Sequence, residues 1–187
     1  MKYFAVCLLM PLLLIACQKQ KSVAKNFSDI GNVIYNMQSH HVSLNLEKMM
    51  CCIPDNDTAR VDIMKSGYRL VVYMDSSKCS PCIISKMYMW NSLIEKTRES
   101  GDKVGYVFIF EPKKEQIEDA IWAVESSGLK NRIYIDTACV FKRDNPFVPK
   151  AEMYHAMLIN KKDSILLVGM PLTNHKVEEL FFNIINN

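Results

Sequence analysis

Two cysteines separated by two residues form the pattern in this sequence with the clearest chemical meaning. Cys79 and Cys82 enclose Ser80 and Pro81. If a helix begins here, the second cysteine lies about one turn after the first, so the two sulfurs can reach bonding distance. Unsatisfied N–H groups at the start of a helix favour a thiolate, which is the attacking species in thiol–disulfide exchange. The pair therefore indicates redox chemistry, provided that a helix follows it.

The sequence around this pair predicts a strand before it and a helix after it. Residues 70–74 are continuously apolar, as expected for a strand covered on both faces. Pro81 costs little in a first helical turn, where the missing N–H has no helical partner. The helix is predicted by an apolar stripe made up of Ile83, Met87, Trp90 and Ile94, with Ile84 and Tyr88 beside it. The cysteine pair is thus expected at a strand-to-helix junction.

The rest of the chain predicts a mixed α/β order. The first two buried strands require a parallel pair joined by a crossover helix, and the late hairpin adds antiparallel strands. After the cysteine pair we expect strands over 104–110, 132–136, 156–159 and 164–168, a helix with Pro112 in its first turn and a helix capped near Thr173 or Asn174. Before it we expect a helix over 27–37, short strands over 42–46 and 49–53, and a turn at 55–58.

In element order and cysteine spacing, the sequence resembles the thioredoxin superfamily, and more closely its TlpA-like branch of periplasmic, often lipid-anchored thiol-disulfide oxidoreductases. The resemblance covers about residues 49–187 and includes the strand at 71–73 and the hairpin at 157–163. It implies a thioredoxin-like three-layer α/β/α fold with a central mixed sheet. It also implies that Cys79 is the exposed nucleophile that forms a mixed disulfide with a protein partner, and that Cys82, one turn inward, resolves it. Pro81 matches the family's commonest reductant sequence, and neither a cofactor nor a metal is implied.

Three positions depart from the family pattern. The family's cis-proline, which faces the cysteines and exposes backbone for substrate pairing, corresponds to Tyr154 or His155, so these two are the candidate substrate-binding residues. Lys78 replaces the usual aromatic residue, and it either lowers the pKa of the cysteine after it or is an ordinary surface lysine. Tyr73 stands where the family often has a buried acid, and nearby Asp75 is either a proton relay or a loop cap.

The N-terminus resembles a bacterial lipoprotein signal. An apolar run over 4–16 is too short to span a bilayer but has the length of a signal-peptide core, and it ends directly before Cys17. We therefore expect a signal peptide over 1–16, a diacylated Cys17 as lipid anchor and a polar tether over 17–26. A thioredoxin-like domain should occupy 27–187, with residues 27–48 as an N-terminal extension. An ordinary secretory signal is the alternative.

These features place the mature protein in the bacterial cell envelope, on the periplasmic side or surface, anchored to the membrane. Its expected partners are periplasmic protein disulfides or thiols, and we expect a monomer. The 23 Lys and Arg residues against 20 Asp and Glu residues leave a net charge of +3, which is too small to indicate nucleic-acid binding.

Two other functions remain open from the sequence. A thioredoxin-like fold that has lost its activity would be a binding lipoprotein with a structural Cys79–Cys82 disulfide. Alternatively, Cys79, Cys82 and His155 could hold Cu(I) or Zn(II) through two thiolates and an imidazole. Cys51, Cys52 and Cys139 are expected to be structural, Cys139 as a buried thiol, and the sequence leaves their pairing open.

Overall fold

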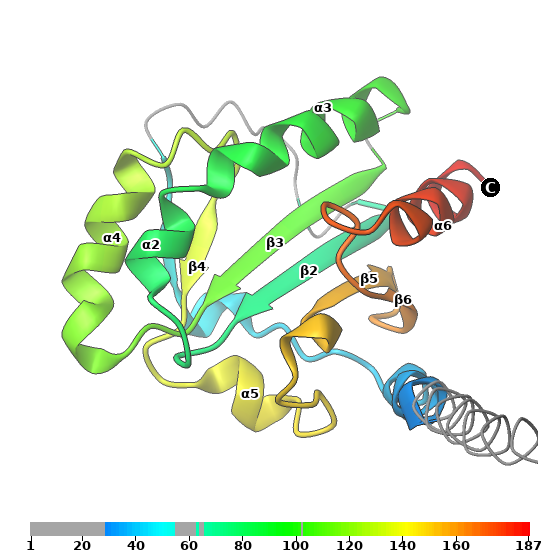
Figure 1. Ribbon diagram of the computed structural model, residues 1–187, viewed down its shortest axis with the longest axis horizontal. Helices are drawn as coiled ribbons and strands as arrows, with labels where there is room; N and C mark the ends of the chain where they lie inside the picture. Colours follow the sequence, from blue (N-terminus) through cyan, green and yellow to red (C-terminus); the bar gives the residue numbers. More distant parts are fainter. Residues whose placement is uncertain (1–28, 55–62, 64–65, 102) are drawn as a thin grey trace, which may run out of the picture. The chain divides into compact units, whose positions relative to one another are not determined.

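A computed structural model of the chain describes residues 29–54, 63, 66–101 and 103–187 (Figure 1). The expected signal peptide, the tether, the anchor residue Cys17 and the turn at 55–58 lie outside these residues. The chain divides into two units, Met1–Met37 and Gln38–Asn187. Residues 29–38 are helical, in agreement with their apolar spacing. Within the described residues, no helix is both long enough and apolar enough to cross a membrane.

A single mixed sheet of six strands organises the second unit, in the order β1-β4-β3-β2-β5-β6. β2 pairs in parallel with β3, and β3 pairs in parallel with β4. β5 runs antiparallel to β2 and forms the predicted hairpin with β6, while β1 runs antiparallel to β4. The strands are β1 (Met50–Cys52), β2 (Tyr68–Met74), β3 (Val104–Phe110), β4 (Ile133–Ile135), β5 (Ala156–Asn160) and β6 (Ile165–Val168). The predicted α/β class with a mixed sheet is confirmed.

Helical segments connect these strands and end the chain. The α-helices in the described part of the second unit are α2 (Ser80–Ile84), α3 (Asn91–Glu99), α4 (Ile117–Glu125), α5 (Val140–Asp144) and α6 (His175–Asn186). Short 3-10 turns are η1 (Leu46–Lys48), η2 (Met87–Trp90), η3 (Lys114–Gln116) and η4 (Glu152–Tyr154). α6 begins as predicted, because the side-chain oxygen of Asn174 accepts hydrogen bonds from the N–H groups of Lys176 and Val177 at 3.1 and 3.3 Å.

The main core lies on one face of the sheet. Alternate residues of a strand point to the same face, and Leu70 and Val72 of β2 join Phe108 of β3 in one buried cluster. Side chains from α2, η2, α3, α4 and α6 complete this cluster. Figure 1 shows α2 and α4 side by side, and α3 next to β3. Burial on this face, at about 1.5–3 kcal/mol for each large apolar side chain, holds α2 against the sheet.

The opposite face carries a thinner layer. The ring of Tyr73 on β2 lies 4.8 Å from the ring of Phe141 on α5, so α5 covers this face. The segment after residue 41 also belongs here: Ser43 donates its N–H to the Asn145 side chain at 2.7 Å, directly after α5. The sheet therefore has helical cover on both faces, in the three-layer arrangement that the resemblance implies.

Local structure differs from the sequence prediction in several places. The strand expected over 42–46 is wrong, since the only pairing here is an isolated bridge between His41 and Ser164, and 46–48 turn into η1. The single helix expected after the cysteine pair is broken into α2, η2 and α3, because the bond from the Lys86 N–H goes to the Ile83 carbonyl three residues back. The helix expected at Pro112 begins two residues later, as η3. α5 and η4 were not predicted.

Candidate active site

A disulfide joins Cys79 and Cys82 where β2 leads into α2. Cys79 is the N-cap of α2, in extended backbone conformation, and its carbonyl accepts the Ile83 N–H at 3.2 Å. The two Cα atoms are 5.3 Å apart, within the usual range for a disulfide. The predicted strand-to-helix junction is confirmed, and it brings the two predicted catalytic cysteines together.

The exposures of the two cysteines are the reverse of those expected. Cys79 is partly buried, whereas Cys82 is exposed. The reason is the register of α2, which buries Ser80 and Ile84 against the core and so turns Cys82 outward. The expectation of an exposed Cys79 with an inward Cys82 is therefore wrong in this oxidised form.

The loop between β2 and the disulfide is held by Asp75. Its carboxylate accepts the N–H of Ser77 at 3.0 Å and the Ser77 hydroxyl at 2.5 Å. Burial raises the pKa of Asp75, but the hydrogen bonds from Ser77 outweigh this, so the pKa is lowered. Of the two interpretations left open for Asp75, the geometry favours the loop cap, because an ionised acceptor bound within its own loop is poorly suited to relay protons.

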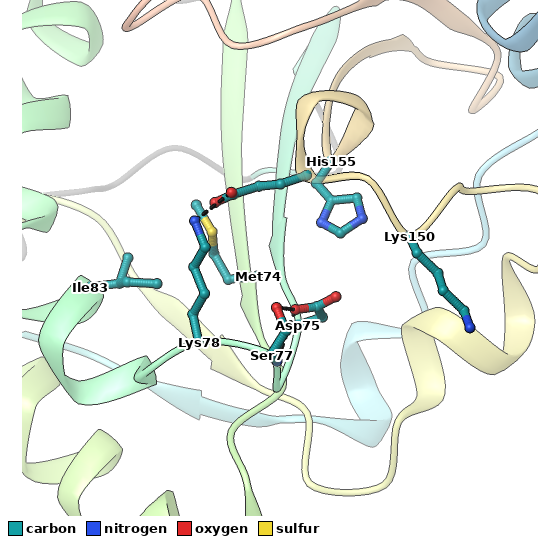
Figure 2. A pocket seen from close by; sticks show the side chains of 8 residues that line it. Met74, Asp75, Ser77, Lys78, Ile83, Lys150 and His155 are labelled. Atoms are coloured by element: carbon teal, nitrogen blue, oxygen red, sulfur yellow. Dashed lines mark hydrogen bonds and ion pairs between the residues drawn. The ribbon is translucent and has the colours of Figure 1, made fainter.

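Lys78, directly before the disulfide, forms an ion pair with Glu152 of η4 (Figure 2). Both side chains are about half exposed, so the pair contributes at most about 1 kcal/mol to stability. Its carboxylate partner offsets the lysine charge, which one of the two interpretations left open would have act on the neighbouring cysteine. The pair links the loop before α2 to the segment before β5.

The two candidate substrate-binding residues lie at the end of η4, directly before β5. No peptide bond among the described residues is cis, so the Tyr154–His155 bond is trans. The His155 carbonyl accepts the Tyr73 N–H at 2.9 Å, so this carbonyl is already bonded within the protein. His155 is 3% exposed, and Tyr154 is also buried. Their role in substrate binding stays a prediction.

His155 faces a small hollow beside the disulfide loop (Figure 2). Its Nε2 lies 2.8 Å from the carbonyl oxygen of Pro149, and its ring lies 5.1 Å from that of Tyr73. The hollow is lined by Met74, Asp75, Ser77, Lys78, Ile83, Lys150, Glu152 and His155. Neither cysteine lines it. Across the described residues, no group of three or more His, Cys, Asp or Glu side chains is placed to hold a metal, so the Cys79, Cys82 and His155 set is not assembled.

A buried carboxylate that the sequence reasoning missed lies at the end of β3. Glu111 is 4% exposed, and its carboxylate accepts the hydroxyl of Tyr73 at 2.5 Å and that of Ser76 at 3.3 Å. Burial, and then the hydrogen bond to Glu111, raises the pKa of Tyr73 far above its usual range, so the phenol stays protonated and donates. Tyr73, at the position where the resemblance implied a buried acid, is thus bound to an acid that directly follows the neighbouring strand. A glutamate directly after an apolar strand was the available signal.

The three remaining described cysteines are free thiols. Cys51 is exposed and Cys52 is partly buried, where burial raises the pKa of its thiol. Cys139 is exposed, so its prediction as a buried thiol is wrong. Local burial of its sulfur and the nearby Glu111 carboxylate raise the pKa of Cys139. No disulfide joins these three residues.

The connectivity around the disulfide decides the fold. A β2-helix-β3 unit with parallel strands precedes the antiparallel hairpin β5–β6 and then α6, and β2 is the strand shared by both halves. The cysteine pair lies at the start of the helix that follows this shared strand. The fold is thioredoxin-like. This confirms the fold-level resemblance that the sequence indicated.

No family model matches the chain, and no curated protein matches its sequence. Solved structures do resemble it. A candidate thiol:disulfide interchange protein DsbE from Chlorobium tepidum is 16% identical, with 73% of this chain and 91% of that chain covered, at a TM-score of 0.46. A candidate protein disulfide isomerase from Bacteroides thetaiotaomicron is 14% identical over 66% and 74% of the two chains, at 0.44. A peroxiredoxin Q from Xanthomonas campestris is 9% identical over 65% and 79%, at 0.43. These likenesses are too remote to transfer an activity, which must be argued from the residues of this chain.

Proposed function

We propose that this protein is a membrane-anchored thiol-disulfide oxidoreductase of the bacterial cell envelope that exchanges disulfides with protein partners. The observation that best supports this proposal is the Cys79–Cys82 disulfide, which lies where a loop leads into a helix and leaves Cys82 exposed. A disulfide buried on all sides would be inert, whereas an exposed one can be attacked by a thiolate. The envelope location and the anchor rest on the N-terminal signal pattern and on Cys17.

The expected direction is reduction of the partner. In that direction the reduced protein gives two electrons to a partner disulfide and becomes the disulfide form described above, while the partner leaves with two thiols. A thiol donor must then reduce the protein again. The support for this direction is Pro81, which matches the family's reductant pattern.

Reduction of insulin disulfides by the full chain, with dithiothreitol as electron donor, tests the proposal. We expect the wild-type chain to accelerate the reaction, and Cys79→Ser and Cys82→Ser each to abolish the acceleration. Cys51→Ser is the matched control, because this exposed thiol on β1 has no disulfide partner. A wild-type rate equal to that of dithiothreitol alone would refute the proposal.

The reduction potential of the disulfide tests the direction separately. Equilibration with glutathione buffers should give a value near that of thioredoxin, about −270 mV, if the protein is a reductant. A value near about −120 mV, as for a strong oxidant, would reverse the direction and leave the exchange chemistry intact.

A non-catalytic binding protein is the second candidate. It is favoured by the position before β5, where a proline that pairs with substrates is replaced by His155, whose carbonyl is already bonded to the Tyr73 N–H. The same insulin assay separates the two candidates, since a binding protein with a structural disulfide would show no catalysis.

Lipid anchoring gives its own prediction. A signal-processed chain acylated at Cys17 should fractionate with membranes and incorporate labelled palmitate. Cys17→Ser should lose both properties, because the acyl chains supply the membrane affinity. Membrane association of the variant without label would contradict acylation at this residue.

A further inference from the structure

A buried hydroxyl without a partner lies between the two cysteines. Ser80, the first residue of α2, is 1% exposed, and its Oγ has no hydrogen-bond partner among the residues that the structure describes. Ser127 is equally buried, yet its Oγ donates to the Val124 carbonyl at 2.8 Å, so burial alone does not leave a serine unbonded. Unbonded buried polar atoms are rare in native proteins, and a redox or catalytic role is one reason for them.

The position of Ser80 on α2 brings its hydroxyl near one of the two sulfurs. Ser80 and Ile84 are both buried on the core side of the helix. Cys82 is two residues from each of them, so it lies about half a turn away, on the outer side. Cys79 directly precedes Ser80, is the N-cap of α2 and is partly buried. Of the two sulfurs, that of Cys79 is therefore within reach of the Ser80 hydroxyl.

The groups that commonly stabilise a thiolate contribute little at Cys79. The charge of Lys78 is offset by the Glu152 carboxylate, with which it forms an ion pair. Pro81 has no backbone N–H to donate. α2 has only five residues, so few aligned peptide dipoles point at the cysteine. One additional donor in this turn should thus have a large effect on a Cys79 thiolate.

The other titratable groups around this turn cannot take that role. The carboxylates of Asp75 and Glu111 accept hydrogen bonds from hydroxyl groups, and an ionised carboxylate has no proton to donate. His155 lines a hollow that neither cysteine lines. The acids of α4, which packs against α2, are exposed; they are Glu118, Asp119 and Glu125. Ser80 is therefore the available donor.

We propose that the Ser80 hydroxyl donates a hydrogen bond to the Cys79 thiolate that forms when the disulfide is reduced. The hydroxyl has no acceptor in the oxidised form and gains one on reduction. Ser80 therefore favours the dithiol form and lowers the pKa of Cys79. This role deepens the proposed function and rests on it.

The hydroxyl acts when a dithiol donor reduces the disulfide. One donor thiolate attacks the Cys79 sulfur, forms a mixed disulfide and displaces the Cys82 sulfur as a thiolate. The second donor thiolate attacks the donor sulfur of the mixed disulfide, so the donor closes to a disulfide and the Cys79 sulfur leaves as a thiolate. The protein gains two electrons and the donor loses two. Solvent takes up the two donor protons and returns one to Cys82, while Ser80 keeps its own proton.

The thiol pKa of Cys79 tests this donor directly. The full chain carrying Cys82→Ser is compared with chains that also carry Ser80→Ala or Ser80→Thr, and mass spectrometry follows the alkylation of Cys79 by iodoacetamide over a range of pH. Ser80→Ala should raise the Cys79 pKa by at least about 0.5, whereas Ser80→Thr, which keeps a hydroxyl, should leave it unchanged. A smaller rise with alanine, or an equal rise with threonine, would overturn the proposal.

The redox equilibrium tests the same role with both cysteines present. Wild type, Ser80→Ala and Ser127→Ala are equilibrated with dithiothreitol buffers at pH 8. The equilibrium constant for reduction should fall at least about threefold in Ser80→Ala, which means a more negative potential. It should not change in Ser127→Ala, whose hydroxyl already has a carbonyl acceptor. An unchanged constant in Ser80→Ala would overturn the proposal.

Urea unfolding separates this role from a purely structural one. In the oxidised protein, Ser80→Ala should not lower the urea midpoint, because the missing hydroxyl forms no bond there. In the reduced protein at pH 8 it should lower the midpoint. Equal losses in both forms would show that Ser80 bonds some other group throughout, and they would overturn the proposal.

Failure of the proposed function has a different signature. A wild-type chain that does not reduce insulin would refute that function, whatever the effect of Ser80→Ala on the pKa and the potential. Insulin reduction by the wild-type chain, with no effect of Ser80→Ala on either quantity, would refute only the role of Ser80. The two failures are therefore distinguishable.

Discussion

The hydrogen bond between Tyr73 and Glu111 allows a single hydroxyl to be tested. Tyr73→Phe removes that hydroxyl and keeps the ring, whose neighbours are Phe141 at 4.8 Å and His155 at 5.1 Å. What remains is a carboxylate that is 4% exposed and keeps a 3.3 Å bond from Ser76. The variant thus measures how much the phenol stabilises the buried acid.

A hydrogen bond to a charged group contributes about 1.5–3 kcal/mol, and the short 2.5 Å contact between buried partners belongs to this class. Because Ser76 still donates to Glu111, we expect the variant to lose about 2 kcal/mol of unfolding free energy. This loss corresponds to a change of about thirtyfold in the folding equilibrium.

Urea unfolding of the oxidised protein at neutral pH measures the loss. Tryptophan fluorescence follows it, because Trp90 is 3% exposed in the main core whereas Trp122 is already 77% exposed. The matched control is Tyr106→Phe, which removes a buried hydroxyl bonded at 3.1 and 3.2 Å to the neutral partners Thr97 and the Leu93 carbonyl. It should cost about 1 kcal/mol.

The reasoning fails if Tyr73→Phe costs less than Tyr106→Phe, since the charged acceptor would then give no advantage. A double-mutant cycle sharpens the result. When Glu111 is first replaced by Gln, the cost of Tyr73→Phe should fall by at least about 0.5 kcal/mol. An unchanged cost would show that the hydroxyl acts elsewhere.

Three other substitutions have defined outcomes. Asp75→Asn should lower the unfolding free energy by on the order of 1 kcal/mol at neutral pH. The folded pKa of Asp75 lies below its unfolded value of about 3.9, so this stabilisation is present above that value and is lost as the pH falls through the folded pKa. In urea unfolding at acid pH, wild type and variant should therefore become equally stable, and a difference that does not change with pH would contradict the loop-cap role. Asn174→Ala should cost about 1 kcal/mol by removing the N-cap of α6, with Asn186→Ala, at an exposed residue of the same helix, as a near-neutral control; equal effects would argue against the cap. Asp136→Ala should lower the unfolding free energy, measured by thermal unfolding, by at least about 2 kcal/mol. The reason is that this fully buried carboxylate accepts hydrogen bonds from the N–H groups of Val140 and Phe141 at 2.9 and 2.8 Å. An unchanged stability would mean that α5 does not depend on Asp136.

The strand-to-helix framework could be predicted because its signals are local. The apolar runs of β2 and β3 and the polar turn between β5 and β6 each carry their own pattern, and they were placed within a residue or two. Short elements were not found. α5 has five residues and is held by the Asp136 carboxylate, which comes from the end of β4 and has no periodic pattern to reveal it.

The partners within the site could not be predicted, because they come from separate segments. The Tyr73–Glu111 bond joins residues 38 positions apart, and the Lys78–Glu152 ion pair joins residues 74 positions apart. Strand register fixes the first pair: Met74 lies opposite Phe110, so Glu111 lies just beyond the end of β2. No spacing along the chain contains this information.

The sequence by itself determined the cysteine pair, its position between a buried strand and a helix, and the order of elements that gives the thioredoxin-like fold, since these depend on local spacing and apolar patterning. The tertiary structure decided which cysteine faces the solvent. The apolar stripe was predicted as one continuous helix, but the break after α2 lets the core hold Ser80 and Ile84 independently of Met87 and Trp90. Packing against the sheet, which no single segment can specify, therefore sets the rotation of α2 and turns Cys82 outward.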